Sequence, residues 1–144
     1  MFARINSLGV YALNGFSVSV EADISGGLPQ FTIVGLPDSA VREATDRVRS
    51  ALKNLSFVWP VSRITVNLAP GDIRKTGPVY DLPVLLAILA ASGQLPVPGP
   101  EDAFIGELSL DGGVRSVTGV LPMALAAVQQ GAVSYTHLTL PTIR

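Results

Sequence analysis

Apolar and polar residues alternate along the first part of the chain. Between residues 16 and 24 every second side chain is apolar, and serine, glutamate and aspartate fill the positions between them. A period of two predicts a strand with one buried face. The preceding segment, 2–13, is predicted as its partner strand, and Asn14-Gly15 is typical of the two-residue turn of a hairpin. A short third strand is predicted at 30–34.

Between residues 38 and 55 the apolar spacing changes to three and four, which predicts a helix. Asp38 or Ser39 is expected to provide its N-cap. The remaining helix positions carry mainly basic and acidic side chains, which is typical of a face in solvent. The predicted apolar stripe consists of Val41, Ala44, Val48, Leu52 and Leu55.

The second half of the chain mixes strands, loops and helices. A strand is predicted at 63–68, and an apolar helix at 81–92 with Asp81 as its N-cap. A second hairpin, with its turn at 111–113, and a last helix at 121–130 follow. Antiparallel hairpins beside separate helices favour an α+β fold over a doubly wound parallel sheet.

The composition restricts the class of protein. With 144 residues the chain is expected to form one domain that buries about two-thirds of its unfolded surface. The absence of cysteine excludes disulfides and thiolate metal sites and favours a reducing cytoplasm. A net charge of −1 provides no overall attraction to nucleic acid or to an anionic membrane. We expect no leader peptide, and the most apolar stretch, 82–91, is much shorter than the ~20 residues of a membrane span.

The last residues are identified as foreign to the protein. Residues 133–142 read VSYTHLTLPT, which matches the translation of a transposon-derived sequencing adapter. The alternative is a native edge strand, because threonine, leucine and tyrosine alternate there. On the adapter interpretation the native domain is 1–132, the segment 133–144 is an artefact, and His137, the single histidine, is not native. We therefore predict neither histidine-based acid–base chemistry nor a histidine metal site.

No nucleotide-binding motif is recognised. A phosphate loop needs the pattern GxxxxGK[ST], in which glycines form a backbone nest and a lysine reaches the phosphates. The nearest approach is Gly71 followed by Lys75-Thr76, but Arg74 stands where the second glycine belongs. Pro78 follows almost at once, so no helix is expected to begin there. The acidic residues are interpreted as surface charge, and their spacing predicts no metal site.

The segment 64–83 is the most informative part of the chain. A buried strand, an irregular loop and an apolar helix follow one another there, which is a common way to present a site on a rigid frame. The alternative is a tight strand-to-helix connection with Asp81 as N-cap. The candidate functional loop consists of Lys75, Gly77, Pro78, Tyr80 and Asp81.

Three long segments carry a resemblance to a known family. They read SGGLPQFTIVGLPDSAVREATDRVRSAL, ITVNLAPGDIRKTGPVYDLPVLLAILAASGQL and FIGELSLDGGVRSVTGVLPMALAA. In this order, over about 1–132, they resemble the amino-terminal part of the ComM/YifB family of magnesium-chelatase-like AAA+ ATPases. The resemblance is specific, because several long segments match in the same order along the chain.

This resemblance implies an α+β fold of the ribosomal protein S5 domain 2 type, similar to the Lon peptidase domain, with a mixed or antiparallel sheet and packed helices. It also implies a parent protein that is a cytoplasmic, hexameric DNA motor, acting in branch migration during natural transformation in the case of ComM. The expected partners are the parent's own AAA+ module, neighbouring subunits and DNA. ATP and Mg²⁺ are expected cofactors of the parent, and none is expected in this chain.

The likeness to Lon can be followed at the two positions of the peptidase dyad. Lon peptidases carry a G-P-S motif whose serine is the nucleophile; here Gly77-Pro78 match and Val79 replaces the serine. Their lysine follows a G-G-L segment at the start of the last helix, and here Leu121 replaces it. Neither valine nor leucine can attack a carbonyl or accept a proton. The resemblance therefore implies a non-catalytic domain that serves assembly, regulation or contact with DNA or a partner.

Two other functions stay open. The first is a DNA-binding module, in which a basic face meets phosphates, although acidic side chains interleave with it and a solvated helix is the simpler interpretation. The residues of this face are Arg42, Arg47, Arg49, Lys53 and Arg74. The second is a Ser-Lys peptidase that uses Ser109 or Ser116, for which only Lys53 and Lys75 can supply the amine.

Overall fold

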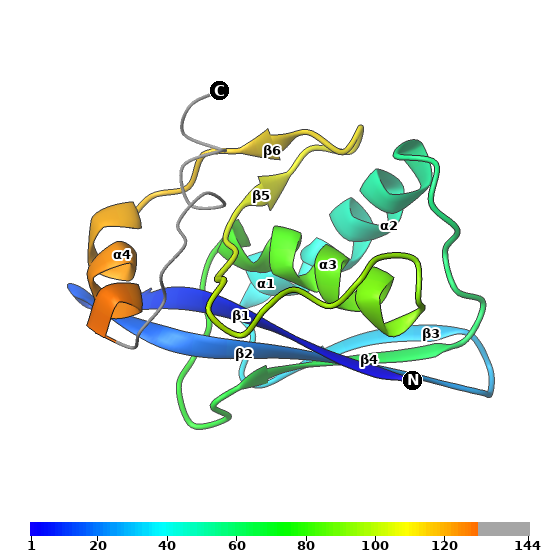
Figure 1. Ribbon diagram of the computed structural model, residues 1–144, viewed down its shortest axis with the longest axis horizontal. Helices are drawn as coiled ribbons and strands as arrows, with labels where there is room; N and C mark the ends of the chain where they lie inside the picture. Colours follow the sequence, from blue (N-terminus) through cyan, green and yellow to red (C-terminus); the bar gives the residue numbers. More distant parts are fainter. Residues whose placement is uncertain (130–144) are drawn as a thin grey trace.

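The main sheet contains four strands and, as predicted, belongs to a mixed α+β fold (Figure 1). The computed structural model describes residues 1–129. The sheet has the order β1-β2-β4-β3, in which β3 and β4 are parallel and the other neighbours are antiparallel. Its strands are β1 (Phe2–Tyr11), β2 (Asn14–Ser25), β3 (Gln30–Val34) and β4 (Arg63–Ala69).

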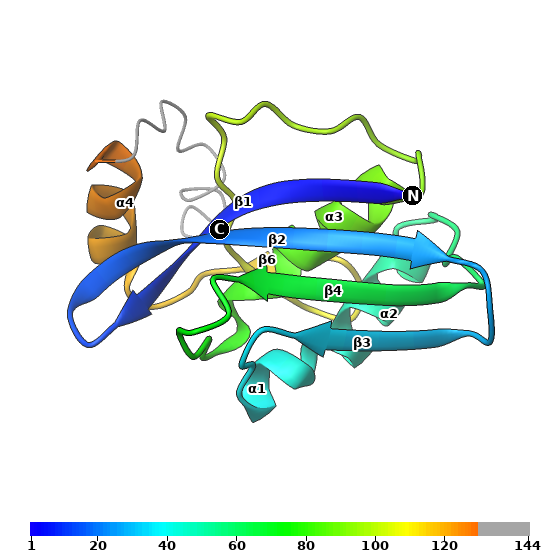
Figure 2. The same cartoon turned by 90° about the horizontal axis from the view of Figure 1, so that it is seen from below.

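The helices cover one face of this sheet (Figure 1), and the other face is open (Figure 2). Helices α1 and α2 connect β3 to β4, α3 packs on β1 and β2, and α4 packs on the β1–β2 hairpin. A short second sheet, β5–β6, lies between α3 and α4 in the chain. The bounds are α1 (Ser39–Arg42), α2 (Ala44–Asn54), the 3₁₀ helix η1 (Pro78–Tyr80), α3 (Asp81–Ala91), β5 (Glu107–Leu108), β6 (Val114–Arg115) and α4 (Val120–Gln129).

The alternating pattern of β2 is confirmed, because its apolar residues from Val18 to Ile24 are buried. The predicted turn at Asn14-Gly15 is wrong. Asn14 pairs with Tyr11, so the two turn residues are Ala12 and Leu13. Gly15 has another role: a Cβ atom there would lie 2.3 Å from the carbonyl oxygen of Pro122. The glycine thus allows α4 to approach the hairpin closely, which a local turn signal does not reveal.

The helix predicted over 38–55 is two helices. The break falls at Glu43, where the hydroxyl of Thr45 donates a hydrogen bond to the carbonyl of Arg42 (3.1 Å). Such a bond competes with the regular ladder of a helix. Four members of the predicted apolar stripe are buried, but Leu55 lies beyond the end of α2 and is exposed.

The second hairpin is shorter than predicted, although its turn lies at 111–113 as expected. The residues before β5 bond to other elements: Phe104 N–H donates to the Asn6 carbonyl (2.9 Å) and Gly106 N–H donates to the Val79 carbonyl (2.9 Å). This loop therefore covers part of the β1 edge and also holds the segment that follows β4.

The adapter interpretation of 133–144 concerns residues outside the described part of the chain, and it stays a prediction. Within residues 1–129, no helix combines the length and the apolar character that crossing a membrane requires.

Candidate functional site

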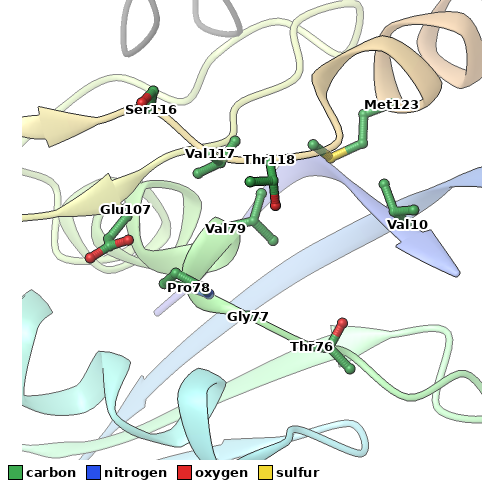
Figure 3. Close-up of a pocket in the computed structure, with 10 residues that line it drawn as sticks. All are labelled: Val10, Thr76, Gly77, Pro78, Val79, Glu107, Ser116, Val117, Thr118 and Met123. Atoms are coloured by element: carbon green, nitrogen blue, oxygen red, sulfur yellow. The ribbon is translucent and has the colours of Figure 1, made fainter.

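A cleft of about 340 Å³ opens beside the segment that was predicted as the functional loop (Figure 3). Its apolar side is formed by Val10, Val79, Val117 and Met123. Its polar side is formed by Thr76, Glu107, Ser116 and Thr118, together with the backbone of Gly77 and Pro78. In the view of Figure 3, the hydroxyl group of Thr118 points downward and that of Thr76 points upward. Strand β1, the loop before α3, β5 and the start of α4 thus contribute to one cleft.

The loop at the cleft is held by a short parallel pairing with the residues after β3. Lys75 N–H donates to the Leu36 carbonyl (3.0 Å), and Asp38 N–H donates to the Lys75 carbonyl (2.9 Å). The Asp38 carboxylate then accepts from Val41 N–H (2.8 Å) and from Gly77 N–H (3.2 Å). Asp38 is therefore the N-cap of α1, as predicted, and it also holds Gly77 in place at the cleft. This second role depends on a contact with a residue 39 positions away, so the sequence pattern did not indicate it.

Asp81 is not an N-cap, contrary to prediction. It is the first residue of α3, and its side chain is fully buried. Its carboxylate accepts from Arg47 Nε (2.6 Å), from Arg47 Nη2 (3.1 Å) and from Leu108 N–H (3.1 Å). Burial raises the pKa of the Asp81 carboxyl, while the bonds from Arg47 and Leu108 act in the opposite direction. The residue links α2, α3 and β5.

Arg47, predicted as a possible DNA contact, donates hydrogen bonds within the protein from all three of its guanidinium nitrogens. Beyond Asp81, its Nη2 donates to the carbonyl of Ala40 (2.9 Å) and its Nη1 reaches Glu43 (3.5 Å). The bond to Asp81 raises the pKa of Arg47, and the guanidinium stays charged. These bonds use most of the donors that a phosphate would need, and a role of Arg47 in binding DNA stays a prediction.

The other basic residues do not form a continuous cluster. Arg42 and Lys53 are exposed on α1 and α2, where Glu43 and Asp46 interleave with them. Arg49 lies over the ring of Trp59, at 5.3 Å from its centroid. Arg74 belongs to the loop after β4 and is exposed. A role of these four residues in binding DNA stays a prediction.

Val79 and Leu121, which stand where Lon has its catalytic serine and lysine, lie in different surroundings. Val79 is buried and lines the cleft, whereas Leu121 is 70% exposed and does not line it. If both dyad positions were kept in space, Val79 and Leu121 would line the same cleft, but only Val79 does. On α4, Met123 and Ala127 face the sheet, and the helical rotation of about 100° per residue turns Leu121 outward. Met123 is the α4 residue that reaches the cleft.

The two lysines, which would supply the amine of a Ser-Lys peptidase, lie in different surroundings in the described residues. Lys75 is fully buried, and its Nζ donates to the carbonyl of Pro70. Burial lowers the pKa of this ammonium, although the charge of Asp72 opposes the change. Ser109 is engaged in its own turn, where its hydroxyl bonds to Asp111. Lys53 is exposed on α2, and no hydrogen bond joins a lysine to a serine within residues 1–129.

The residues around Gly77 also do not fit a nucleotide phosphate or Mg²⁺. A phosphate site requires free backbone N–H groups and an outward lysine, but Gly77 N–H bonds to Asp38 and Lys75 points inward. Tyr80, another predicted loop residue, is buried in the core, where burial raises the pKa of its hydroxyl. No group of three or more acidic or histidine side chains lies close enough to hold a metal in the described part of the chain.

Comparison with known proteins identifies the family to which this chain is similar. The family model described as subunit ChlI of Mg-chelatase matches residues 20–141. The chain is 52% identical over 111 residues to the competence protein ComM of Haemophilus influenzae, covering 76% of this chain and 22% of ComM. It is 43% identical over 128 residues to YifB of Escherichia coli, covering 88% of this chain and 25% of YifB. The chain thus spans about a quarter of these relatives.

A weaker similarity connects the chain with peptidases. It is 26% identical over 134 residues to the Lon protease of Clostridioides difficile, covering 88% of this chain and 17% of that protein. The similarity agrees with the mixed sheet and its packed helices. The family match also extends over residues 130–141, which lie outside the described part.

Proposed function

Because this chain belongs to the family of the ChlI subunit of Mg-chelatase, we propose that it is a non-catalytic domain of a magnesium-chelatase-like AAA+ ATPase. The domain is proposed to serve assembly or regulation of that motor through the cleft beside Val79. ATP and Mg²⁺ would bind to the parent's AAA+ module, outside this chain. The ATPase activity and the DNA substrate belong to the proposal as well, because the chain spans only about a quarter of its relatives.

One observation carries the proposal: Val79 occupies the cleft at the position where the resemblance to Lon places a serine. The cleft keeps an apolar side and two threonine hydroxyl groups, a combination that suits an apolar side chain of another polypeptide with its backbone amides. A hydrolytic dyad requires a nucleophile next to a base. Of the two lysines, Lys75 donates to the carbonyl of Pro70, and Lys53 is exposed on α2.

We expect the purified chain to remain unlabelled by a fluorophosphonate probe, which reacts with activated serines. The physical reason is that a serine without an adjacent base is a poor nucleophile. A Lon peptidase domain serves as the positive control, and labelling is read by intact-protein mass spectrometry. Stoichiometric labelling that disappears in Ser116→Ala would identify a nucleophile and contradict the non-catalytic part of the proposal.

The assembly role is tested by filling the cleft in a full-length family member that carries this domain. Thr118→Arg places a long side chain in the cleft from an exposed position and does not disturb the core. We expect ATP-dependent oligomer formation to weaken about tenfold or more, because a blocked pocket cannot receive its partner side chain. Thr65→Arg, an identical change on the open face of the sheet, should have no effect. Equal assembly of both variants and the unmodified protein would refute the role of the cleft.

A further inference from the structure

The face of α4 that points away from the sheet carries a row of apolar side chains, at one end of the molecule (Figure 1). Leu121, Leu125 and Val128 follow one another at spacings of four and three, so they share one side of the helix. Their exposed fractions are 70%, 56% and 61%. We call these three residues the outer stripe. No residue from Val120 to Val128 carries a charge, and a helix that is apolar all round is typical of a helix covered on both sides.

The opposite face of α4 holds the helix in a fixed rotation. Met123, Ala126 and Ala127 are buried, and the helix makes its main contacts with β1 and β2. Gly15 of β2 allows a very close approach, because a Cβ atom there would lie 2.3 Å from the carbonyl oxygen of Pro122. Helix α4 therefore cannot turn the outer stripe toward the sheet without losing these contacts.

Helix α2 shows how the same chain builds a helix that faces solvent. Its inner positions are apolar and buried, whereas its outer positions include Asp46 and Lys53, both exposed. This division is typical of a surface helix. In α4 the corresponding outer positions hold two leucines and a valine. A row of large apolar side chains left exposed on one helix face indicates an interaction surface.

The point at which the chain leaves α4 indicates what covers the outer stripe. The helix ends at Gln129, one residue after Val128. The chain resembles the amino-terminal part of its relatives and spans about a quarter of their length, so the other three quarters continue from this helix end. A segment joined by a short linker has an effective concentration in the millimolar range, about a thousandfold above a protein at about 1 µM. It therefore occupies the stripe ahead of a separate molecule.

We propose that the outer stripe is the docking surface for the part of the parent polypeptide that follows α4. That part packs on Leu121, Leu125 and Val128 through apolar side chains, within the same chain. Helix α4 then lies between two layers, with the β1–β2 hairpin on one side and the rest of the parent on the other. The inference rests on the proposed function, in which the AAA+ module follows this domain, and it specifies the surface that joins the two.

The first test measures whether the stripe is covered in the parent. The chain contains no cysteine, so Leu125→Cys places a single thiol on the stripe. Its alkylation by N-ethylmaleimide is followed by peptide mass spectrometry in the 144-residue chain and in a full-length family member that carries this domain. We expect alkylation in the full-length protein to be about tenfold slower or more, because a covered thiol reacts only after local opening.

Leu28→Cys is the matched control for this experiment. Leu28 is 88% exposed in the loop between β2 and β3, away from α4, and its thiol should react at the same rate in both proteins. Equal alkylation rates of Leu125→Cys in the two proteins would overturn the inference.

The second test asks whether the cover belongs to the same chain. Without ATP, the protection of Leu125→Cys in the full-length protein should stay constant between about 0.1 and 10 µM, because docking within one chain does not depend on concentration. Protection that appears only at the higher concentrations would assign the stripe to a contact between subunits and overturn the proposal.

The third test asks whether apolar contact holds the cover in place. In the full-length protein, Leu125→Asp should raise the alkylation rate of a Leu121→Cys thiol to its value in the 144-residue chain, because a carboxylate is not tolerated in an apolar contact. Leu125→Met conserves volume and should keep the protection. Continued protection in Leu125→Asp would refute apolar docking. None of these measurements involves the cleft, so the Thr118→Arg and fluorophosphonate experiments can fail or succeed independently.

Discussion

Replacing Asp81 by alanine is expected to lower the free energy of unfolding by about 3–5 kcal/mol. The change leaves the Arg47 guanidinium largely buried without its counter-ion, and it removes the acceptor of Leu108 N–H. If Asp81 acted only as an N-cap, its replacement would lower the free energy of unfolding by only about 1 kcal/mol. Urea unfolding of the two proteins, followed by circular dichroism, measures the difference.

Two controls separate the buried pair from general effects of substitution. Glu43→Ala removes the exposed partner of the same guanidinium and should cost less than about 1 kcal/mol. The double variant Arg47→Met/Asp81→Leu should recover most of the stability, because two apolar side chains can replace a buried ion pair. A loss near 1 kcal/mol for Asp81→Ala, with no recovery in the double variant, would mean that the ion pair is not the cause.

Replacing Gly35 by alanine should cost about 3–4 kcal/mol. The φ of Gly35 is +106°, and a Cβ atom there would lie 2.2 Å from the carbonyl oxygen of Leu68. Leu68 belongs to β4, which is paired on both sides by β2 and β3, so its backbone cannot move away. The loss of stability is measured by urea unfolding, as for Asp81.

Gly26→Ala provides the matched control for Gly35, because a Cβ atom there has no neighbour within 4 Å. We expect this change to alter stability by less than about 0.5 kcal/mol. Amide hydrogen exchange adds a second measurement: in Gly35→Ala the N–H groups of Asp38, Lys75 and Gly77 should lose protection, because the pairing beside the cleft depends on Gly35. Unchanged protection together with unchanged stability would show that β4 can accommodate the methyl group.

Much of the candidate site could be located from the sequence, although the roles of several of its residues could not be predicted. The segment 64–83 was correctly identified as a strand, an irregular loop and a helix, and Val79 lies in a cleft. Asp81 was misassigned because a carboxylate at the start of a helix has the same local pattern whether it caps the helix or pairs with a distant cation. The resemblance to Lon places Leu121 at the position of the lysine, but an alignment gives the position along a helix and does not show which side of the helix faces inward.

The sequence by itself determined most of the local elements, because their periodicity is a local property. The alternation in β2, the spacing in α2 and the cap at Asp38 each depend on residues within a few positions of one another. The tertiary structure alone decided which side chains meet across the sheet and the helix layer. Arg47 and Asp81 lie 34 positions apart, and Asp38 and Gly77 lie 39 apart. Their contacts arise where α2 packs beside α3 and α1 packs beside η1, which no local pattern encodes.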